Sequence, residues 1–331
     1  MKIGNLDLGE RPLLLAPMED VTDASFRMLC REQGADLVYT EFVNSDGLVR
    51  DVSKTIAKMH TFEAEAPVGV QIYGHIPESM VEAARMADRA AEIAGGHGAY
   101  LVDINFGCPV SKIAGRGAGS GMMREPDKMV AITRAVVEAV GKPVTVKTRL
   151  GWDDDSKIIV ELAERLQDAG ISALTIHGRT RCQLYRGAAD WSLIGAVKAN
   201  PRMRIPIIGN GDITDGPSAR EAFERYGVDA VMIGRATFGH PWIFREIKYY
   251  LEHGEPMPEL SVAEKVALAR RHLALSLELK GRPRGIYEMR RHLSCYFKGL
   301  PDFKETRMRM VTTLDPAELG DILDSIEKRY D

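Results

Sequence analysis

Short apolar segments recur along the first 236 residues at intervals of about 30 residues, with helix-like segments between them. Each is almost continuously apolar and rich in β-branched residues, which is typical of parallel strands covered on both faces. There are eight such segments: 13–18, 36–41, 68–74, 100–106, 144–150, 173–179, 205–211 and 230–236. Eight strand–helix units in series predict an α/β protein with a closed (β/α)8 TIM barrel, and an open doubly wound sheet is the structural alternative.

The pattern changes after about residue 240. Segment 252–261, EHGEPMPELS, is rich in Pro and Glu and is typical of a linker, and only helical patterns follow it. We therefore expect a catalytic barrel over residues 1–250 and a small all-helical domain over residues 251–331. The length of 331 residues suits one barrel of about 250 residues with a smaller domain.

The charge of the chain is unevenly distributed. Residues 281–310 hold eight Lys or Arg against three Asp or Glu, a net charge of +5, whereas the whole chain carries −3. A basic stretch on an acidic body can mark a site for a polyanion such as a nucleic acid. Composition alone favours the alternative, a solvated helix face with uneven charge.

Several classes of protein are excluded by what the sequence lacks. No apolar run approaches the roughly 18 residues of a membrane span, and the N-terminus does not have the pattern of a signal peptide, so we expect a cytoplasmic protein without membrane contact. The four cysteines are widely separated and form no CxxC pair, which predicts neither a disulfide framework nor a metal site. Nothing in the sequence indicates an obligate protein partner.

Polar residues or glycines follow nearly every predicted strand. In a barrel, the carboxyl ends of the strands meet at one rim, where active groups lie. Singly, each residue has a structural explanation, such as a rim lysine or a core histidine, but seven such strand ends are hard to produce by packing alone. The residues are Ala16, Pro17, Met18, Gln71, Asn105, Cys108, Lys147, Arg149, His177, Arg179, Asn210, Gly211, Asp212, Gly234 and Arg235.

The ends of the last two predicted strands indicate a phosphate site. GNGD (209–212) and GRA (234–236) are turns at the position where barrels bind phosphate, and Arg235 adds a fixed cation. Two tight turns that require positive φ are the structural alternative. A ligand anchored there would lie across the barrel mouth, with Lys147 facing its middle and Gln71 offering a donor and an acceptor to an imide edge. These groups suit a phosphorylated flavin, FMN.

Six longer motifs carry a resemblance to a known family. They are LLLAPMEDVTDASFR, DINFGCPVSKIAGRGAGSGMM, VKTRLGWD, TIHGRTRCQLYRGAADW, IIGNGDI and VMIGRATFGHPWIF. They resemble the tRNA-dihydrouridine synthase family over about residues 10–310, and their order and the C-terminal helical segment are most similar to the bacterial B-type. One departure, RGAGSGMM at 116–123, concerns the mobility of a loop and not the reaction.

The resemblance implies an FMN-dependent barrel that uses NADPH or NADH to reduce one uridine carbon–carbon double bond in tRNA to 5,6-dihydrouridine. No Rossmann fingerprint is present, so we expect the nicotinamide to bind transiently at the same mouth. The FMN contacts that the resemblance implies are Ala16, Pro17, Met18, Gln71, Lys147, His177, Asn210, Gly211, Asp212, Gly234 and Arg235.

The resemblance also makes Cys108 the proton donor. Reduced flavin delivers hydride to one alkene carbon of uracil, and the neighbouring carbon needs a proton. A thiol with a pKa near ~8.5 is mostly protonated at neutral pH and can supply it. The turn over residues 107–121, which we call the cysteine loop, can close over a bound base. We interpret Cys30, Cys182 and Cys295 as structural.

A uridine within folded RNA must be flipped out to reach a flavin inside a barrel. We expect phosphate contacts from the basic helical domain to offset the cost of flipping. The residues that we expect to contact substrate are Asn105, Arg149, Arg179, Arg181 and Arg291. Either Arg181 or Arg291 could equally be a surface cation in a local ion pair.

Three other functions stay open at the level of sequence. A barrel reductase of a free pyrimidine, as in dihydroorotate dehydrogenase, shares the lysine and the cysteine loop but needs no basic helical domain. A Schiff-base aldolase that uses Lys147 would need no flavin. A non-catalytic RNA-binding protein on a degenerate barrel would be colourless.

Overall fold

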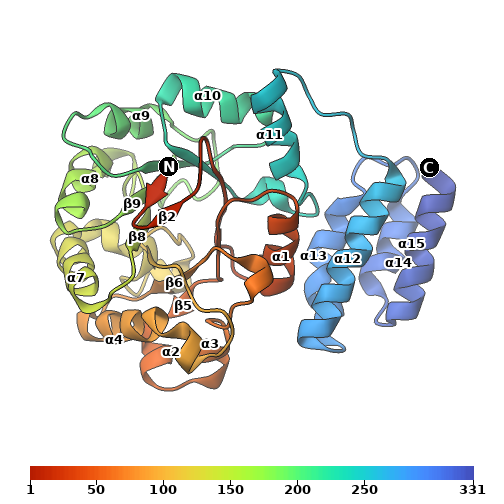
Figure 1. The fold of residues 1–331 in the computed structure, drawn as a ribbon, viewed down its shortest axis with the longest axis horizontal. Coiled ribbons are helices and arrows are strands. Elements are labelled where there is room, and N and C mark those ends of the chain that lie inside the picture. Colours follow the sequence, from red (N-terminus) through yellow and green to blue (C-terminus); the bar gives the residue numbers. More distant parts are fainter.

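The computed structural model describes residues 1–331 as a barrel followed by a bundle of helices (Figure 1). Eight parallel strands pair in the order β3-β11-β10-β9-β8-β7-β6-β4, and a parallel bridge between Leu14 and Leu37 closes the cylinder between its first two strands. The strands are β3 (Leu13–Leu15), β4 (Val38–Tyr39), β6 (Val68–Tyr73), β7 (Leu101–Asn105), β8 (Val144–Arg149), β9 (Ala173–His177), β10 (Ile207–Asn210) and β11 (Ala230–Ile233). Each predicted segment contains one of them, so the predicted barrel is confirmed.

Helices cover the outside of the barrel. Their ends follow the sequence: Asp215 caps α10 by accepting from Ser218 N at 2.8 Å, and Gly227, at φ +67°, ends that helix in the left-handed conformation. The helices are α1 (Ala24–Glu32), α2 (Ser45–Val49), α3 (Ser53–Ala57), α4 (Pro77–Asp88), α5 (Ala90–Ile93), α6 (Ser111–Ala114), α7 (Pro126–Ala139), α8 (Ile159–Asp168), α9 (Ser192–Ala199), α10 (Gly216–Tyr226) and α11 (Ile243–His253). Short 3-10 turns are η1 (Glu63–Glu65), η2 (Gly119–Arg124), η3 (Asp154–Ser156) and η4 (Arg235–Thr237).

Alternate residues of each strand face opposite sides of the barrel wall. On β8, Val144 and Val146 belong to the cluster of 50 buried residues that packs the strands against the helices. Lys147 and Arg149 therefore face inward, and both line a cavity at the carboxyl end of the barrel. The alternation along β8 thus turns its charged residues toward the barrel interior and its valines toward the helices.

The amino-terminal end of the barrel is closed by a hairpin that the sequence analysis did not predict. Strands β1 (Lys2–Ile3) and β2 (Leu6–Asp7) pair antiparallel, and the fully buried Ile3 packs in the inner cluster with Leu14 and Leu101. A second short strand, β5 (Val43–Asn44), adds to β6 at the other end. Strands of two residues are too short to produce a periodic pattern, so tertiary pairing alone defines them.

The C-terminal residues form four helices beside the barrel, drawn in blue in Figure 1. They are α12 (Val262–Lys280), α13 (Arg284–Tyr296), α14 (Lys304–Thr312) and α15 (Pro316–Tyr330). They enclose a separate cluster of 16 buried residues, which also takes in Trp242 from the end of the barrel. None of the helices in the protein is both long and apolar enough to cross a bilayer.

The helical region contacts the barrel through α1. The Phe26 ring lies against His272 of α12 and His292 of α13, with ring centroids 5.3 and 4.1 Å away. Beside them, the ammonium of Lys280 pairs with Asp23, the residue that caps α1, and with Glu288. Burial would raise the pKa of Asp23, but the charges of Lys280 and His272 lower it far below its usual value. This interface is therefore both apolar and ion-paired.

Candidate active site

A cavity of about 460 Å³ lies at the carboxyl ends of the barrel strands, within the size range of small-molecule sites. Most residues that the sequence predicted for a site meet there. Those that line the cavity are Ala16, Pro17, Met18, Asn105, Cys108, Lys147, Arg149, His177, Asn210, Gly211, Asp212, Gly234, Arg235 and Arg291. Arg291 comes from α13, so the helical region contributes directly to the mouth of the barrel.

Lys147 provides a cation near the centre of the cavity. Its ammonium donates to Asn210 Oδ1 at 3.1 Å, and the Asn210 amide donates in turn to the Met232 carbonyl at 2.7 Å. Burial and the nearby charge of Arg149 lower the pKa of Lys147 to about 8. At that pKa the ammonium is still mostly charged at neutral pH, and a buried cation without a carboxylate partner is suited to interact with a ligand that carries negative charge.

His177 provides a buried imidazole that has no partner for Nδ1 within the chain. The side chain is 8% exposed. Burial, together with the charges of Arg149 and Lys147, lowers the pKa of His177 well below its usual value, so the ring is neutral. The unpartnered nitrogen belongs to a residue that lines the cavity, so it is available for a hydrogen bond to a ligand there.

The turn after β10 organises the cationic side of the cavity. Asp212, at φ +54°, accepts from Arg179 Nη2 at 2.5 Å, from Ala189 N at 2.8 Å and from Arg235 Nη2 at 3.1 Å. Gly211, at φ +121°, is required because a Cβ there would lie 2.9 Å from the Ala189 Cβ. Asp212 therefore positions Arg235, whose guanidinium is about half exposed at the mouth.

The backbone of the cysteine loop is held by three side chains. The side-chain amide oxygen of Asn105, Oδ1, accepts from the backbone N–H groups of Gly107 and Cys108, each at 2.9 Å. Arg149 Nε donates to the Gly107 carbonyl and Ser120 Oγ to the Cys108 carbonyl, both at 2.8 Å. Burial raises the pKa of the Cys108 thiol, so the sulfur is protonated at neutral pH. The loop presents a fixed, protonated thiol to the cavity.

Three predicted residues do not line the cavity. Gln71 is fully buried beneath it, with its amide between Asp103 and Asn105. Arg179 is 2% exposed and pairs with Asp212, while the Arg181 guanidinium stacks 4.7 Å from the Trp152 ring. Their contacts with cofactor or substrate stay predictions. The Gln71 amide is fully engaged within the chain, whereas Arg179 Nη1 and Arg181 Nε are buried without a hydrogen-bond partner.

The sequence analysis missed an aromatic residue at the mouth. Tyr185 is 52% exposed and lines the cavity. Its ring lies 5.7 Å from the Arg149 guanidinium and 4.7 Å from that of Arg235. The available signal was the segment RTRCQLYRG, which places a tyrosine among arginines, although only the arginines were considered. Tyr185 offers a flat surface against which a planar ring can stack.

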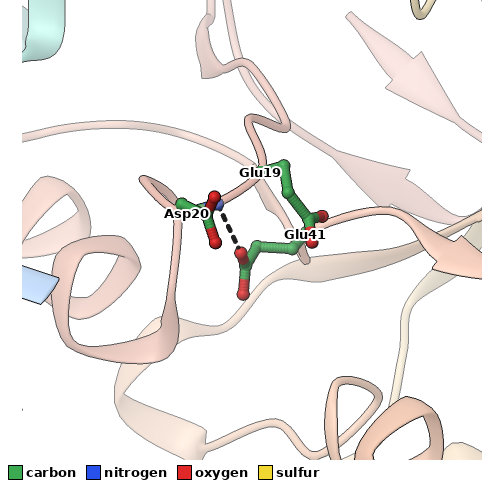
Figure 2. Close-up of side chains that lie close together, drawn as sticks. All are labelled: Glu19, Asp20 and Glu41. Carbon is green, nitrogen blue, oxygen red and sulfur yellow. Dashed lines mark hydrogen bonds between the residues drawn. The ribbon is translucent and has the colours of Figure 1, made fainter. Parts of the chain in front are cut away.

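An acidic cluster lies at the edge of the same mouth (Figure 2). Carboxylate oxygens of Glu19, Asp20 and Glu41 lie within 4.8 Å of one another. The Asp20 N–H donates to Glu41 at 2.7 Å, and the ammonium of Lys58 pairs with Glu19. Since Lys58 already supplies a positive charge to these partly exposed carboxylates, we assign no metal to the cluster.

Solved structures with the same architecture define the fold class of the protein. A morphinone reductase mutant in complex with tetrahydroNAD aligns over 78% of this chain and 91% of its own, with 14% identity and a TM-score of 0.54. An old yellow enzyme homologue from Zymomonas mobilis aligns over 78% and 93%, with 13% identity and a TM-score of 0.52. These likenesses show the barrel fold. The mouth of this barrel holds a cationic lysine, an unpartnered imidazole and a thiol, which are groups that can take part in catalysis.

Sequence comparison identifies the family within that class. The model of the dihydrouridine synthase family matches residues 14–329. The tRNA-dihydrouridine synthase B of Klebsiella pneumoniae is 42% identical over 298 residues, covering 90% of each chain. A probable tRNA-dihydrouridine synthase of Rickettsia conorii is 39% identical over 317 residues, covering 96% of this chain and 93% of its own. The chain belongs to the dihydrouridine synthase family, and the predicted resemblance is confirmed.

Proposed function

We propose that the protein reduces a uridine double bond in tRNA to dihydrouridine, with FMN across the barrel mouth and NADPH or NADH as reductant. The observation that carries the proposal is the protonated Cys108 thiol, which the cysteine loop holds at the same cavity as Lys147 and His177. The relatives named tRNA-dihydrouridine synthase support the substrate class.

The cavity residues fit a phosphorylated flavin. Arg235 and the turns at Gly211 and Gly234 would hold the phosphate, since glycine backbone can approach an anion closely. Lys147 and the unpartnered Nδ1 of His177 would meet the polar atoms of the ring. The bound cofactor supplies hydride in its reduced form, and the surrounding residues orient it and exclude water.

Cys108 supplies the proton. Its S–H bond breaks as the proton passes to the uracil carbon next to the one that accepts hydride, so the double bond gains one hydride and one proton. The charges of Arg149 and Lys147 favour the thiolate that is left, opposing the effect of burial. The thiolate then regains a proton from solvent, which restores the proton donor for the next turnover.

The helical region supports an RNA substrate in preference to a free pyrimidine. Arg291 of α13 lines the cavity, although a small substrate would need no residue from outside the barrel. The same helix carries Arg284 and Arg290, and Arg284 is exposed. Phosphate contacts from such residues would position a tRNA over the mouth while one base is flipped into it.

The proposal is tested by deleting the gene, mapping dihydrouridine in tRNA, and complementing with wild type, Cys108→Ala or Cys182→Ala. We expect Cys108→Ala to keep its yellow colour and to reduce the rate by about 100-fold or more, the range for loss of a general acid. Cys182 lies outside the cavity and is a matched control that should restore modification fully. Full restoration by Cys108→Ala would reject the donor role, and activity of the purified protein on free uracil or orotate would favour the free-pyrimidine reductase.

A further inference from the structure

A directed chain of hydrogen bonds runs beneath the cavity to the cysteine loop. It starts at Asp103 on β7, which is 1% exposed. Gln71 Nε2 donates to Asp103 Oδ2 at 2.6 Å, and Asn105 Nδ2 donates to Gln71 Oε1 at 2.9 Å. The chain ends where Asn105 Oδ1 accepts from the N–H groups of Gly107 and Cys108. Asp103 does not line the cavity and has no part in the proposed reaction.

The direction of this chain follows from the chemistry of its first member. A carboxylate only accepts hydrogen bonds, so the Gln71 amide must turn its nitrogen toward Asp103 and its oxygen toward Asn105. The same requirement passes to the next amide, which turns its nitrogen toward Gln71 and its oxygen toward the loop. Amide groups have nearly the same shape in both orientations, so packing alone would not fix them.

The surroundings keep Asp103 an acceptor. Thr145 Oγ1 donates to its second oxygen, Oδ1, at 2.5 Å. The ionisable groups that face it from neighbouring strands are Lys147 on β8, whose charge favours the carboxylate, and the buried Tyr39 hydroxyl on β4. Burial raises the pKa of Asp103 to about 6, so the carboxylate form prevails at neutral pH.

We propose that Asp103 is a positioning residue that, through Gln71, fixes the orientation of the Asn105 amide and so holds the cysteine loop in place. If Asn105 turned over, its amide nitrogen would face two backbone N–H donors, and three donors would meet without an acceptor. The loop would separate from Asn105, and Cys108 would move from its position at the cavity. The effect on catalysis rests on the proposed function, whereas the placement of the loop does not.

Three substitutions in the full-length, flavin-loaded protein test the proposal. Asp103→Val removes the acceptor and fills the space, and Asp103→Asn keeps an acceptor for Gln71 while its nitrogen can donate to the Thr145 hydroxyl. Thr175→Val is the matched control, because Thr175 is equally buried inside the barrel and its hydroxyl has no hydrogen-bond partner.

Two readouts separate positioning from general damage. One is the rate of dihydrouridine formation on tRNA, split into kcat and KM. The other is the rate at which iodoacetamide alkylates Cys108 relative to Cys182 in the same molecule, measured by mass spectrometry. We expect Asp103→Val to lower kcat at least tenfold with little change in KM for tRNA, and to raise the relative alkylation rate of Cys108 at least threefold. Asp103→Asn and Thr175→Val should stay within about threefold of wild type in both.

Wild-type alkylation of Cys108 in a folded Asp103→Val protein would overturn the proposal. A loss of activity in Thr175→Val as large as in Asp103→Val would also overturn it, because any change inside the barrel would then suffice. If the altered alkylation is found but no variant, wild type included, acts on tRNA, the positioning role stands and the proposed function fails.

A second pair of variants covers the case in which Asp103→Val does not fold. Gln71→Glu sets two carboxylates against each other, which then need a shared proton, so activity should fall as pH rises from 6 to 8. Adding Asp103→Asn to Gln71→Glu places an amide donor next to the introduced carboxylate. The carboxylate that accepts hydrogen bonds then lies at position 71 instead of position 103. We expect the double variant to be at least fivefold more active than Gln71→Glu at pH 8, and equal activities would overturn the proposal.

Discussion

The barrel mouth and the interface between α1 and the helical region each bury a lysine and a histidine. The two regions differ in whether other groups of the chain pair with these side chains. At the interface, Lys280 pairs with two carboxylates, and His292 Nε2 lies 3.3 Å from the Val21 carbonyl oxygen. At the mouth, Lys147 donates only to an amide oxygen, and His177 Nδ1 has no partner. Buried lysine and histidine therefore indicate a ligand site only where the chain leaves them without a counter-charge or a hydrogen bond.

Burial lowers the pKa of a basic side chain in both regions, with different consequences. The pKa of His292 falls to about 4 and the pKa of Lys147 to about 8, in each case mainly because burial penalises the charged form. At the interface the resulting neutral ring packs against Phe26, 4.1 Å between centroids. At the mouth Lys147, which is still mostly charged at neutral pH, faces a cavity instead. Four predictions sharpen this contrast, from the largest expected effect to the smallest.

The first prediction concerns the paired lysine. Lys280→Met leaves Asp23 without its cation, while Glu288 keeps its pair with Arg284. Removing one member of a buried pair destabilises a protein by about 3 kcal/mol. Urea unfolding should show this loss, while flavin affinity per folded molecule stays unchanged. Unaltered stability would mean that the interface ion pair is not structural.

The second prediction concerns the lysine at the mouth. Lys147→Met should weaken FMN binding by about 30-fold, roughly 2 kcal/mol, because a charge-assisted contact to the ring is lost. Stability without flavin should be unchanged or higher, since the substitution removes a buried, unpaired charge. Flavin fluorescence titration and urea unfolding measure the two quantities. If Lys147→Met lost stability but kept its affinity for FMN, Lys147 would be a structural residue and not a ligand contact.

The third prediction is a pH dependence of flavin binding. With its pKa near 8, Lys147 of the flavin-free protein loses its charge as pH rises through that value. Binding of an anionic flavin then requires proton uptake, so affinity should fall by about fivefold between pH 8 and pH 9. The same titration on Lys147→Met should be flat over this range, and a slope that persists there would assign the effect to another group.

The fourth and smallest prediction concerns Tyr185. Replacing its ring by leucine removes a stacking surface but no charge, so we expect a rise in KM for tRNA of about fivefold with nearly constant kcat. Steady-state kinetics measure the two constants. An equal fall in kcat would show instead that the ring positions the reacting base.

Much of the fold and the site could be predicted because eight apolar segments recur at regular spacing and nearly every one ends in polar residues or glycine. The spacing predicts the barrel, and the carboxyl-end rule places Lys147 and Arg149 at its mouth. Depth along the barrel axis is not encoded in the same way. Gln71 faces inward as expected but lies below the cavity, because the length of β6 and its register with β7 set its height.

Partners distant in sequence account for most other differences. Arg179 follows a strand end, as a mouth residue should, yet its guanidinium is taken by Asp212, 33 positions further on. The hairpin of β1 and β2 and the role of Asp103 likewise depend on pairings that no local pattern specifies. The position of a residue at a strand end predicts where its side chain lies. Its hydrogen-bond and ion-pair partners are distant in sequence and are known only from the folded structure.

The plug formed by Ile3 at the amino-terminal end has a consequence for the order of events in turnover. Because the inner cluster fills that end of the cylinder, the cavity communicates with solvent at the opposite end. In the proposed reaction, a nicotinamide and a flipped base would both need the flavin and would have to use this one opening in turn. An excess of either would then slow turnover by excluding the other.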